Sequence, residues 1–515
     1  MTDFTTTTDA QGIATIVWDV PERSMNVLSL EGLAALAALI EAALGDPAVR
    51  GVVITSGKAD FAGGMDLNVI ARMKAEAGEE PARGLFEGIM RMHGVLRRIE
   101  LAGMDPKTKK GGKPVVAALP GTALGIGYEI PLACHRIIAA ANPKARIGLP
   151  EILVGIFPGA GGTTRLARRL GAMAAAPFLL EGRTLAPDKA LAAGLIDEVV
   201  APEALIARAK EWILGAKDAD LVKPWDQRGW KMPGGAPYTP EGFMTFLGAS
   251  AMVMGRTEGA LGPFDTALRI EARRFTQVLM HPSSGAMIRS LFISKQALEK
   301  GARRPEGVPD QSVRRLGVLG AGMMGAGIAQ VAAAAGIEVV LIDADAAAAE
   351  RGKATVAAAF AKAQKRGAMA PERAEAALAR ILPTADYAAL AGVDLIVEAV
   401  FEDPKVKAEV TARAEAAAGP EAIFASNTST LPISDLARAS ARPAQFVGIH
   451  FFSPVDRMNL VEIIRGRETG ARAVAKALDF VRQLRKTPIV VEDARFFYAN
   501  RCIIPYINEG LRMVG

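Results

Sequence analysis

The sequence of 515 residues has only two cysteines, Cys134 and Cys502, and only four histidines. Two thiols cannot form a disulfide framework or a thiolate metal site, which is typical of a reducing compartment, so we expect a cytoplasmic protein. The histidines show neither HxxxH nor HxH spacing. We therefore expect no metal site.

A large excess of charge is also missing. Lys and Arg number 61 and Asp and Glu 55, so 61 minus 55 gives a net charge of +6. That is too dilute for a nucleic-acid-binding protein. The N-terminus lacks the basic and apolar regions of a signal peptide, and no apolar run reaches the ~18 residues that a transmembrane segment needs. With 50% apolar and 23% charged residues, the chain is expected to fold into two to four globular domains.

Residues 1–200 alternate short β-branched runs with alanine-rich helical runs, which predicts an α/β domain. Ser29 is a candidate N-cap for a helix that ends near Leu44. The segment 101–113 is rich in Gly, Pro and Lys and is expected to be an exposed loop. Buried strands are expected at 13–18, 51–55, 113–118 and 136–140.

Residues 201–310 are predicted to be a helical extension and linker. The part 216–240 is rich in Pro, Gly and Trp and is expected to be irregular, whereas 241–300 is expected to be mostly helical. The stretch 301–315, with two prolines and four arginines, is the best linker candidate.

Residues 311–492 follow the order strand, Gly-rich turn, helix, strand, which predicts a parallel, doubly wound sheet. The turn GAGMMG contains Gly320, Gly322 and Gly325 and opens a helix at 323–335. The three glycines allow a tight turn, a close approach of the backbone to a pyrophosphate, and close packing of helix on strand. Further strands are expected at 316–319, 338–342, 395–397, 423–425 and 446–449.

Asp343 ends the strand after the Gly-rich turn, where its carboxylate can accept hydrogen bonds from ribose hydroxyls. A carboxylate at this place repels a 2′-phosphate, so NAD is favoured over NADP. The alternative interpretation is that the glycines form only a structural turn.

Two polar groups follow strands further along the chain, Ser426–Thr430 and His450–Pro454, and Glu462 comes next. Oxidation of a secondary alcohol needs a base for the hydroxyl proton, and a neutral histidine beside a carboxylate is suited to that task. Taken alone, His450 would be interpreted as a structural histidine and Ser429 as a turn residue.

Together these motifs, SNTS and HFFSP, resemble the L-3-hydroxyacyl-CoA dehydrogenase family. The resemblance implies that His450 is the general base, that Glu462 is its partner, and that Ser429 and Asn500 donate hydrogen bonds to substrate. Arg495 and Phe496 occupy positions where the family usually has proline and glycine, and Ser453 replaces a usual asparagine. For NAD, the resemblance and the Gly-rich turn together give Gly320, Gly322, Met324, Gly325, Asp343, Glu402, Lys407, Ser429 and Ser453.

Two glycine clusters follow strands in the first domain, at 61–66 and 121–129. Glycines leave backbone N–H groups uncovered, and two such donors can form an oxyanion hole for a thioester enolate. Glu129 and Glu151 follow, and paired carboxylates in a dry pocket can add water across a conjugated double bond. The alternative interpretation is that both acids are caps or surface residues.

The motifs GTALGIGYE and PE…PGAGG resemble the enoyl-CoA hydratase, or crotonase, family. The resemblance implies a ββα spiral domain, an oxyanion hole formed by the N–H groups of Met65 and Ile126, and an acid/base pair of Glu129 and Glu151. Ile126 replaces a usual glycine, which is tolerated if its φ is negative. Four lysines of the loop could contact coenzyme A phosphates or simply be solvated: Lys107, Lys109, Lys110 and Lys113.

The order of the two domains is similar to that in the α-subunits of bacterial fatty-acid β-oxidation multienzymes. The resemblance implies hydration of trans-2-enoyl-CoA to L-3-hydroxyacyl-CoA and its oxidation by NAD to 3-ketoacyl-CoA. It also implies acyl-CoA thioester substrates, isomerisation on the same acids, a homo-oligomer and a separate 3-ketoacyl-CoA thiolase as partner.

Residues 493–515 match only the start of that family's helical C-terminal domain. A truncated chain, a partner that supplies the remaining helices, and a dehydrogenase half of low activity are the alternatives, and we expect hydration to be intact and oxidation impaired. A hydratase/isomerase with an NAD-binding but inactive second half is the alternative function. A non-catalytic acyl-CoA scaffold and another thioester reaction, such as dehalogenation, are less consistent with the presence of both acids.

Overall fold

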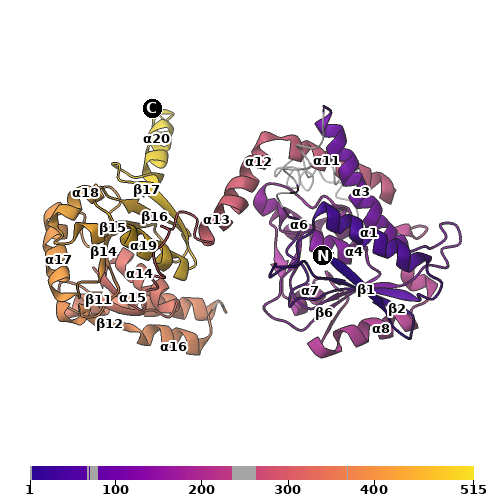
Figure 1. Cartoon of the computed structure of the whole chain (residues 1–515), viewed down its shortest axis with the longest axis horizontal. Coiled ribbons are helices and arrows are strands. Elements are labelled where there is room, and N and C mark those ends of the chain that lie inside the picture. Colours follow the sequence, from indigo (N-terminus) through magenta and orange to yellow (C-terminus); the bar gives the residue numbers. More distant parts are fainter. Residues whose placement is uncertain (1–2, 67–68, 70–78, 235–262, 368, 515) are drawn as a thin grey trace. The chain divides into compact units, whose positions relative to one another are not determined.

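The computed structural model describes residues 3–66, 69, 79–234, 263–367 and 369–514 (Figure 1). The chain forms two compact units, Met1–Ile293 and Ser294–Gly515. Part of the helical stretch expected at 241–300, namely 241–262, lies outside the described residues, as do residues 235–240 of the stretch expected to be irregular. Each unit is described by itself below.

The first unit contains a six-stranded sheet in the order β1-β2-β3-β4-β6-β9. The pairs are parallel except for β1 with β2. Strands such as GVVITS at 51–56 are buried almost throughout, as expected for a sheet that is covered on both faces. The strands are β1 (Phe4–Thr8), β2 (Ile13–Trp18), β3 (Gly51–Ser56), β4 (Val115–Leu119), β6 (Arg136–Ala140) and β9 (Glu198–Val200).

A smaller three-stranded sheet in the same unit has the order β5-β7-β8. Its strands have two residues each, namely β5 (Ala123–Leu124), β7 (Ile147–Gly148) and β8 (Thr184–Leu185). β5 and β7 each end directly before one of the predicted acidic segments. The small sheet therefore brings the ends of two distant segments to one place.

Helices and 3-10 turns surround these sheets. α1 (Leu30–Gly45) begins as predicted at Ser29, whose hydroxyl accepts the N–H of Gly32 at 2.9 Å. Further helical segments include α3 (Pro81–Leu101), α4 (Ile126–Ala133), η1 (Glu151–Val154), α5 (Gly162–Leu170), α6 (Ala172–Leu180), α7 (Pro187–Ala192), α8 (Leu205–Gly215), α11 (Phe264–Met280) and α12 (Pro282–Ile288).

The second unit contains an eight-stranded sheet in the order β12-β11-β10-β13-β14-β15-β16-β17. It is parallel except that β16 runs antiparallel to β15. The doubly wound, Rossmann-type α/β sheet is thus confirmed, with one reversed junction. The strands are β10 (Arg315–Leu319), β11 (Glu338–Ile342), β12 (Ile381–Thr384), β13 (Leu395–Glu398), β14 (Ile423–Ser426), β15 (Phe446–Phe451), β16 (Leu460–Arg465) and β17 (Thr487–Glu492).

Helices pack on both faces of this sheet. Val339 and Leu341 of β11 belong to one buried cluster and Val340 and Ile342 to another, as the alternation of side chains along a strand requires. The helices are α13 (Lys295–Glu299), α14 (Met323–Ala334), α15 (Ala346–Lys365), α16 (Pro371–Ala379), α17 (Pro404–Ala417), α18 (Ile433–Leu436), α19 (Ala471–Gln483) and α20 (Ala499–Arg512). Among the described helices, none is long and apolar enough to cross a bilayer.

Candidate active sites

Glu129 lies in the first turn of α4, which starts directly after Gly125. Its side chain is only 2% exposed, and its Oε1 accepts the N–H groups of Ala160 at 2.9 Å and Gly162 at 2.7 Å. A Cβ atom at position 162 would lie 2.6 Å from this oxygen, so a glycine is required there. Sequence reasoning identified the acid but not the two amides that fix it.

Burial raises the pKa of Glu129 to about 8, and the negative charge of Glu271 adds to the effect. The two amide donors and Arg165 only partly offset this rise. A carboxyl group with such a pKa keeps its proton at neutral pH, so Glu129 can serve as an acid where an ordinary glutamate could not.

Glu151 begins η1, and its Oε1 lies 3.2 Å from the place where a Cβ atom at Gly125 would stand. Its Oε2 is buried and has no hydrogen-bond partner in the described part of the chain. Burial, followed by the charge of Glu129, raises the pKa of Glu151 well above its ordinary value. The structure thus brings both predicted acids together beside the turn before α4, as a coupled pair.

The N–H groups of Met65 and Ile126 are free to bind an oxygen. The N–H of Leu28 donates to the carbonyl oxygen of Gly64, and the carbonyl oxygen of Leu28 accepts the N–H of Asp66. The N–H of Met65, which lies between Gly64 and Asp66 in the sequence, takes no part in this pairing. Ile126 is the first residue of α4, whose first amides have no acceptor within the helix. Neither amide has an acceptor in the described part of the chain.

The two turns that carry these amides adjoin, because a Cβ atom at Gly125 would lie 3.5 Å from the Cα of Gly64. Ile126 is not among the residues with positive φ in the described part of the chain, so the condition for replacing a glycine is met. The geometry is that of a pair of amide donors without acceptors among the described residues, next to two protonatable carboxyl groups.

Lys113, a candidate for phosphate contact, binds backbone carbonyl oxygens in the structure. Its Nζ donates to the carbonyl oxygens of Ala43 at 3.0 Å and Asp46 at 2.5 Å, at the end of α1. This lysine stabilises the C-terminus of a helix, where cations are favoured.

His450 and Glu462 form a hydrogen-bonded dyad in the second unit. They are direct partners in the antiparallel register of β15 and β16, so their side chains leave the sheet on the same face. His450 Nδ1 lies 2.7 Å from Glu462 Oε2, and both side chains are buried. The strand prediction ended at Ile449, but β15 runs on to Phe451, because pairing with β16 continues the ladder through the histidine.

Glu462 also anchors the start of α20. Its Oε1 accepts the N–H groups of Tyr498 at 3.0 Å and Ala499 at 2.8 Å. Burial works against ionisation, but the hydrogen bonds from His450 and from these amides outweigh it and lower the pKa of Glu462. The carboxylate therefore fixes the histidine tautomer with the proton on Nδ1 and leaves Nε2 as an acceptor.

Asn500 and Ser429 meet beside this dyad. Asn500 Nδ2 donates to the backbone oxygen of Ser429 at 2.9 Å, and the neighbouring Asn427 accepts the N–H of Phe451. These bonds tie the SNTS segment to α20 and to β15. The side-chain hydroxyl of Ser429 makes no hydrogen bond with the described residues and is free for a ligand.

Aromatic rings flank the histidine, a feature that the motifs did not reveal. The ring centroid of His450 lies 4.4 Å from that of Phe452 and 6.0 Å from that of Phe497. Phe496 and Phe497 have φ values of 67° and 49°, a left-handed conformation that bulky residues seldom adopt. Phe496 stands where the dehydrogenase family usually has glycine, so the chain keeps the glycine-type turn without the glycine.

The Gly-rich turn fits a dinucleotide. Gly320 has a φ of +94°, and a Cβ atom at Gly325 would lie only 1.7 Å from Gly320 O, so the helix and turn are in direct contact. Nothing lies within 4 Å of a Cβ at Gly322, which leaves open space in front of the first amides of α14. The carboxylate of Asp343 accepts a hydrogen bond from the N–H of Ala321 at 2.6 Å, which fixes the Gly-rich turn to the end of β11.

Glu402 and Lys407 form an ion pair of 3.0 Å. Partial burial works against ionisation, but the hydrogen bond from Thr428 and the charge of Lys407 lower the pKa of Glu402. Lys407 also bonds Glu398 at 2.8 Å, a buried acid that sequence reasoning missed although it ends the strand β13. The amide of Ser429 donates to Glu402 at 3.1 Å, so the predicted NAD residues and the SNTS segment form one network.

Two further predicted NAD residues lie at the edges of this region. Met324 is half-buried and packs against the core under α14. Ser453 is exposed, and its hydroxyl contacts Met323 Sδ at 3.9 Å. The hydroxyl of Ser453 thus faces the first residue of α14, where the turn ends.

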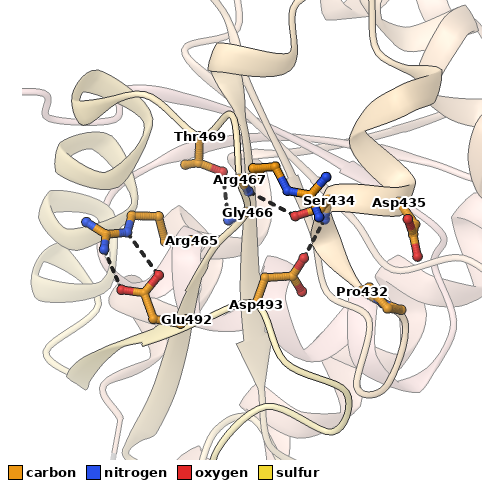
Figure 2. A pocket seen from close by; sticks show the side chains of 9 residues that line it. All are labelled: Pro432, Ser434, Asp435, Arg465, Gly466, Arg467, Thr469, Glu492 and Asp493. Atoms are coloured by element: carbon orange, nitrogen blue, oxygen red, sulfur yellow. Dashed lines mark hydrogen bonds and ion pairs between the residues drawn. The ribbon is translucent and has the colours of Figure 1, made fainter.

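A separate polar cavity of about 570 Å³ opens at the ends of β16 and β17 (Figure 2). Figure 2 shows Arg465 paired with Glu492, and Asp493 directed at the backbone of Ser434. None of the predicted site residues lines this cavity. Among the described residues, no group of three or more His, Cys, Asp or Glu side chains could hold a metal ion.

Comparison with known proteins assigns both halves. Residues 8–218 match the enoyl-CoA hydratase/isomerase family, and residues 315–494 match the NAD-binding domain of 3-hydroxyacyl-CoA dehydrogenases. The chain is similar to FadB2 of M. tuberculosis, at 35% identity over 39% of this chain and 72% of that one (TM-score 0.39). It is similar to (S)-3-hydroxybutyryl-CoA dehydrogenase PaaH1 of Ralstonia eutropha, at 40% identity over 38% and 70% (TM-score 0.37). It is also similar to 3-hydroxybutyryl-CoA dehydrogenase of Escherichia coli K12, at 34% identity over 39% and 43% (TM-score 0.39).

The chain therefore joins an enoyl-CoA hydratase/isomerase domain of crotonase type to the NAD-binding domain of a 3-hydroxyacyl-CoA dehydrogenase. It is a bifunctional enzyme of fatty-acid β-oxidation that acts on acyl-CoA thioesters and uses NAD.

Proposed function

We propose that the hydratase reaction takes place at Glu129 and Glu151, with the amides of Met65 and Ile126 as the oxyanion hole. The observation that supports this best is the coupled, buried pair of acids at the turn before α4. Burial raises the pKa of both acids, and the charge of Glu129 raises that of Glu151 further, so the pair keeps a proton near neutral pH.

A shared proton suits the addition of water to a trans-2-enoyl thioester. The ionised carboxylate accepts a proton from water as its oxygen bonds to the β-carbon, and the protonated partner delivers a proton to the α-carbon. Negative charge on the thioester oxygen is stabilised by the two amides, each of which is worth about 10²–10³ in rate. The same acids can move a proton between carbons, so we also propose isomerisation of 3-enoyl thioesters.

We propose that His450 removes the hydroxyl proton of the L-3-hydroxyacyl product. Glu462 keeps the proton of the neutral imidazole on Nδ1, so Nε2 faces the substrate as base, and the carboxylate stabilises the imidazolium that forms. The side chains of Ser429 and Asn500 would orient the hydroxyl group. Gly320, Gly322, Gly325 and Asp343 would hold NAD, which would supply the hydride acceptor.

The test of the hydratase site is replacement of either acid. Glu129→Gln and Glu151→Gln should each reduce hydration of a four-carbon trans-2-enoyl-CoA by at least about 10²-fold, because the pair loses its proton transfer. Loss of the enoyl absorbance measures the rate. NAD affinity, measured by fluorescence titration, should stay unchanged in both variants, and hydration at the wild-type rate in either one would contradict the assignment.

Partners and domain limits are further proposals. We propose a homo-oligomer, a separate 3-ketoacyl-CoA thiolase that consumes the product, and a cytoplasmic location, the last supported by the two free cysteines. We also propose a hydratase core at 1–200, an extension and linker at 201–310, an NAD-binding domain at 311–492 and the start of a helical domain at 493–515.

A further inference from the structure

A third buried carboxylate, Glu271, lies next to the acid pair. It belongs to α11, which packs against α3 and α5 and lies outside the matched range 8–218. Glu271 is 4% exposed and stands on the apolar stripe formed by Ala267, Leu268, Ala272 and Phe275. A charged residue on the buried face of a helix requires specific partners.

The partners of Glu271 are three donors at the start of α5. Its Oε1 accepts the N–H of Gly161 at 2.6 Å, and its Oε2 accepts both the N–H and the hydroxyl of Thr164, at 2.8 and 2.7 Å. Both oxygens therefore act as acceptors, the arrangement that an ionised carboxylate makes. Burial raises the pKa of Glu271, and these hydrogen bonds together with the charge of Arg165 oppose that rise.

The segment that leads into α5 also binds Glu129, through other amides. Glu129 takes the amides of Ala160 and Gly162, whereas Glu271 takes those of Gly161 and Thr164. The two acids thus use alternating amides of one short segment. Any shift of the segment relative to α11 would move the donors that fix Glu129.

α11 supports this segment by packing as well. A Cβ atom at Gly159 would lie 2.4 Å from the ring of Phe275, and Phe275 makes an edge contact with Phe157 at 5.1 Å. One turn of α11 therefore presses on the segment with Phe275 and binds it with Glu271.

No nearby cation fully offsets the charge of Glu271. His93 of α3 lies 3.7 Å away, but its Nε2 donates to Gly159 O, and burial lowers the pKa of His93 to about 4, so it is neutral. Arg165 is paired with Glu100. The other charged groups that act here are Arg168 of α5, Glu129 of α4 and Glu151 of η1.

We propose that Glu271 is a positioning residue of the hydratase site, which holds segment 159–164 so that its amides bind Glu129 and which places a negative charge beside the acid pair. This inference rests on the proposed hydration at Glu129 and Glu151. It also assigns a part of the active site to a helix beyond the hydratase family's matched range.

The test is the pH profile of hydration in Glu271→Gln. Removal of a like charge makes Glu129 easier to ionise, so the alkaline limb of kcat/KM should move down by about one pH unit. A merely structural role would lower the rate without moving this limb. Asp265→Asn, on the exposed first turn of the same helix, is the matched control and should keep the wild-type profile.

Glu271→Asp separates the effect of the negative charge from the effect of the side-chain length. It keeps the charge but is too short for both Gly161 and Thr164, so kcat should fall at least about 10-fold while the alkaline limb stays in place. This variant decides the matter if Glu271→Gln does not fold. An unchanged limb in the Gln variant, or a wild-type kcat in the Asp variant, would overturn the proposal, whereas absence of hydration in the wild-type chain would overturn the proposed function instead.

Discussion

At the scale of single residues, the environment of each carboxylate sets its chemistry. Glu129 uses only Oε1 for the two backbone amides, and its Oε2 makes no hydrogen bond with the described residues. Glu462 receives donors on both oxygens. The first acid keeps a proton and the second loses it, although the side chains are chemically identical.

Because the pKa of Glu129 is higher in the folded than in the unfolded protein, the folded state becomes less stable as the pH rises. An unfolded Glu129 loses its proton near pH 4.5, whereas the folded group keeps it up to about pH 8. The contribution of Glu129 to the free energy of unfolding is fully present below pH 4.5 and is lost as the pH increases towards 8. Glu129→Gln keeps an oxygen acceptor for the amides and has no proton to lose, so its Tm should exceed the wild-type Tm by a few degrees at pH 8 and match it at pH 4.5.

Thermal unfolding followed by circular dichroism at several pH values would measure this difference. Asp265→Asn again serves as a control, because its carboxylate is exposed. Equal pH dependence of the Tm in wild type and Glu129→Gln would show that Glu129 is ionised in the folded protein.

At the scale of elements, a helix starts at each of the two candidate sites. α4 and α14 each begin directly after a glycine, Gly125 and Gly322, and so leave their first N–H groups open. α20 differs, because Glu462 binds the amides at its start. The backbone amides at the start of α20 thus hold the dyad.

Gly322→Ala tests the role of the open helix start of α14. Its φ of −67° suits alanine, and no atom lies within 4 Å of the added Cβ, so stability should hardly change. The methyl group would instead occupy the space in front of the amides, and NAD affinity should fall at least about 10-fold, or 1.4 kcal/mol.

Fluorescence titration with NAD and a thermal melt would give both numbers. Gly419→Ala, at another glycine with open space around its Cβ, is the matched control and should bind NAD like the wild type. Unchanged NAD affinity in Gly322→Ala would place the pyrophosphate elsewhere.

At the scale of the whole molecule, each unit has its own core. One buried cluster centres on Trp18, Ile54 and Phe61 of the first unit, and the clusters on the two faces of the second sheet share no residue with it. Units with separate cores are expected to unfold separately.

Calorimetry should therefore resolve two unfolding transitions, and NAD should raise the Tm of only one of them. At about 100 times its Kd, a ligand stabilises the unit that binds it by about 2.7 kcal/mol, which corresponds to about 5–10 °C for a unit of this size. A single transition that moves as a whole with NAD would show that the units unfold together.

The sequence by itself determined the local features. The periodicity of apolar residues marked most strands, Ser29 marked a helix start, and the turn at Gly320 with Asp343 marked the proposed dinucleotide site. The pairing of His450 with Glu462 was predicted from the resemblance to the dehydrogenase family, and the antiparallel register of β15 and β16 that sets them opposite each other appears only in the structure. The local features depend on neighbours along the chain, and spacing is enough to define them.

Only the tertiary structure decided the environments. The amides that bind Glu129 come from 31 and 33 residues away, and Glu271 reaches Thr164 across 107 residues. Neither the raised pKa of Glu129 nor the third acid follows from any motif. Desolvation and charge–charge effects depend on distances through space, and those distances are set when helices far apart in the sequence pack together.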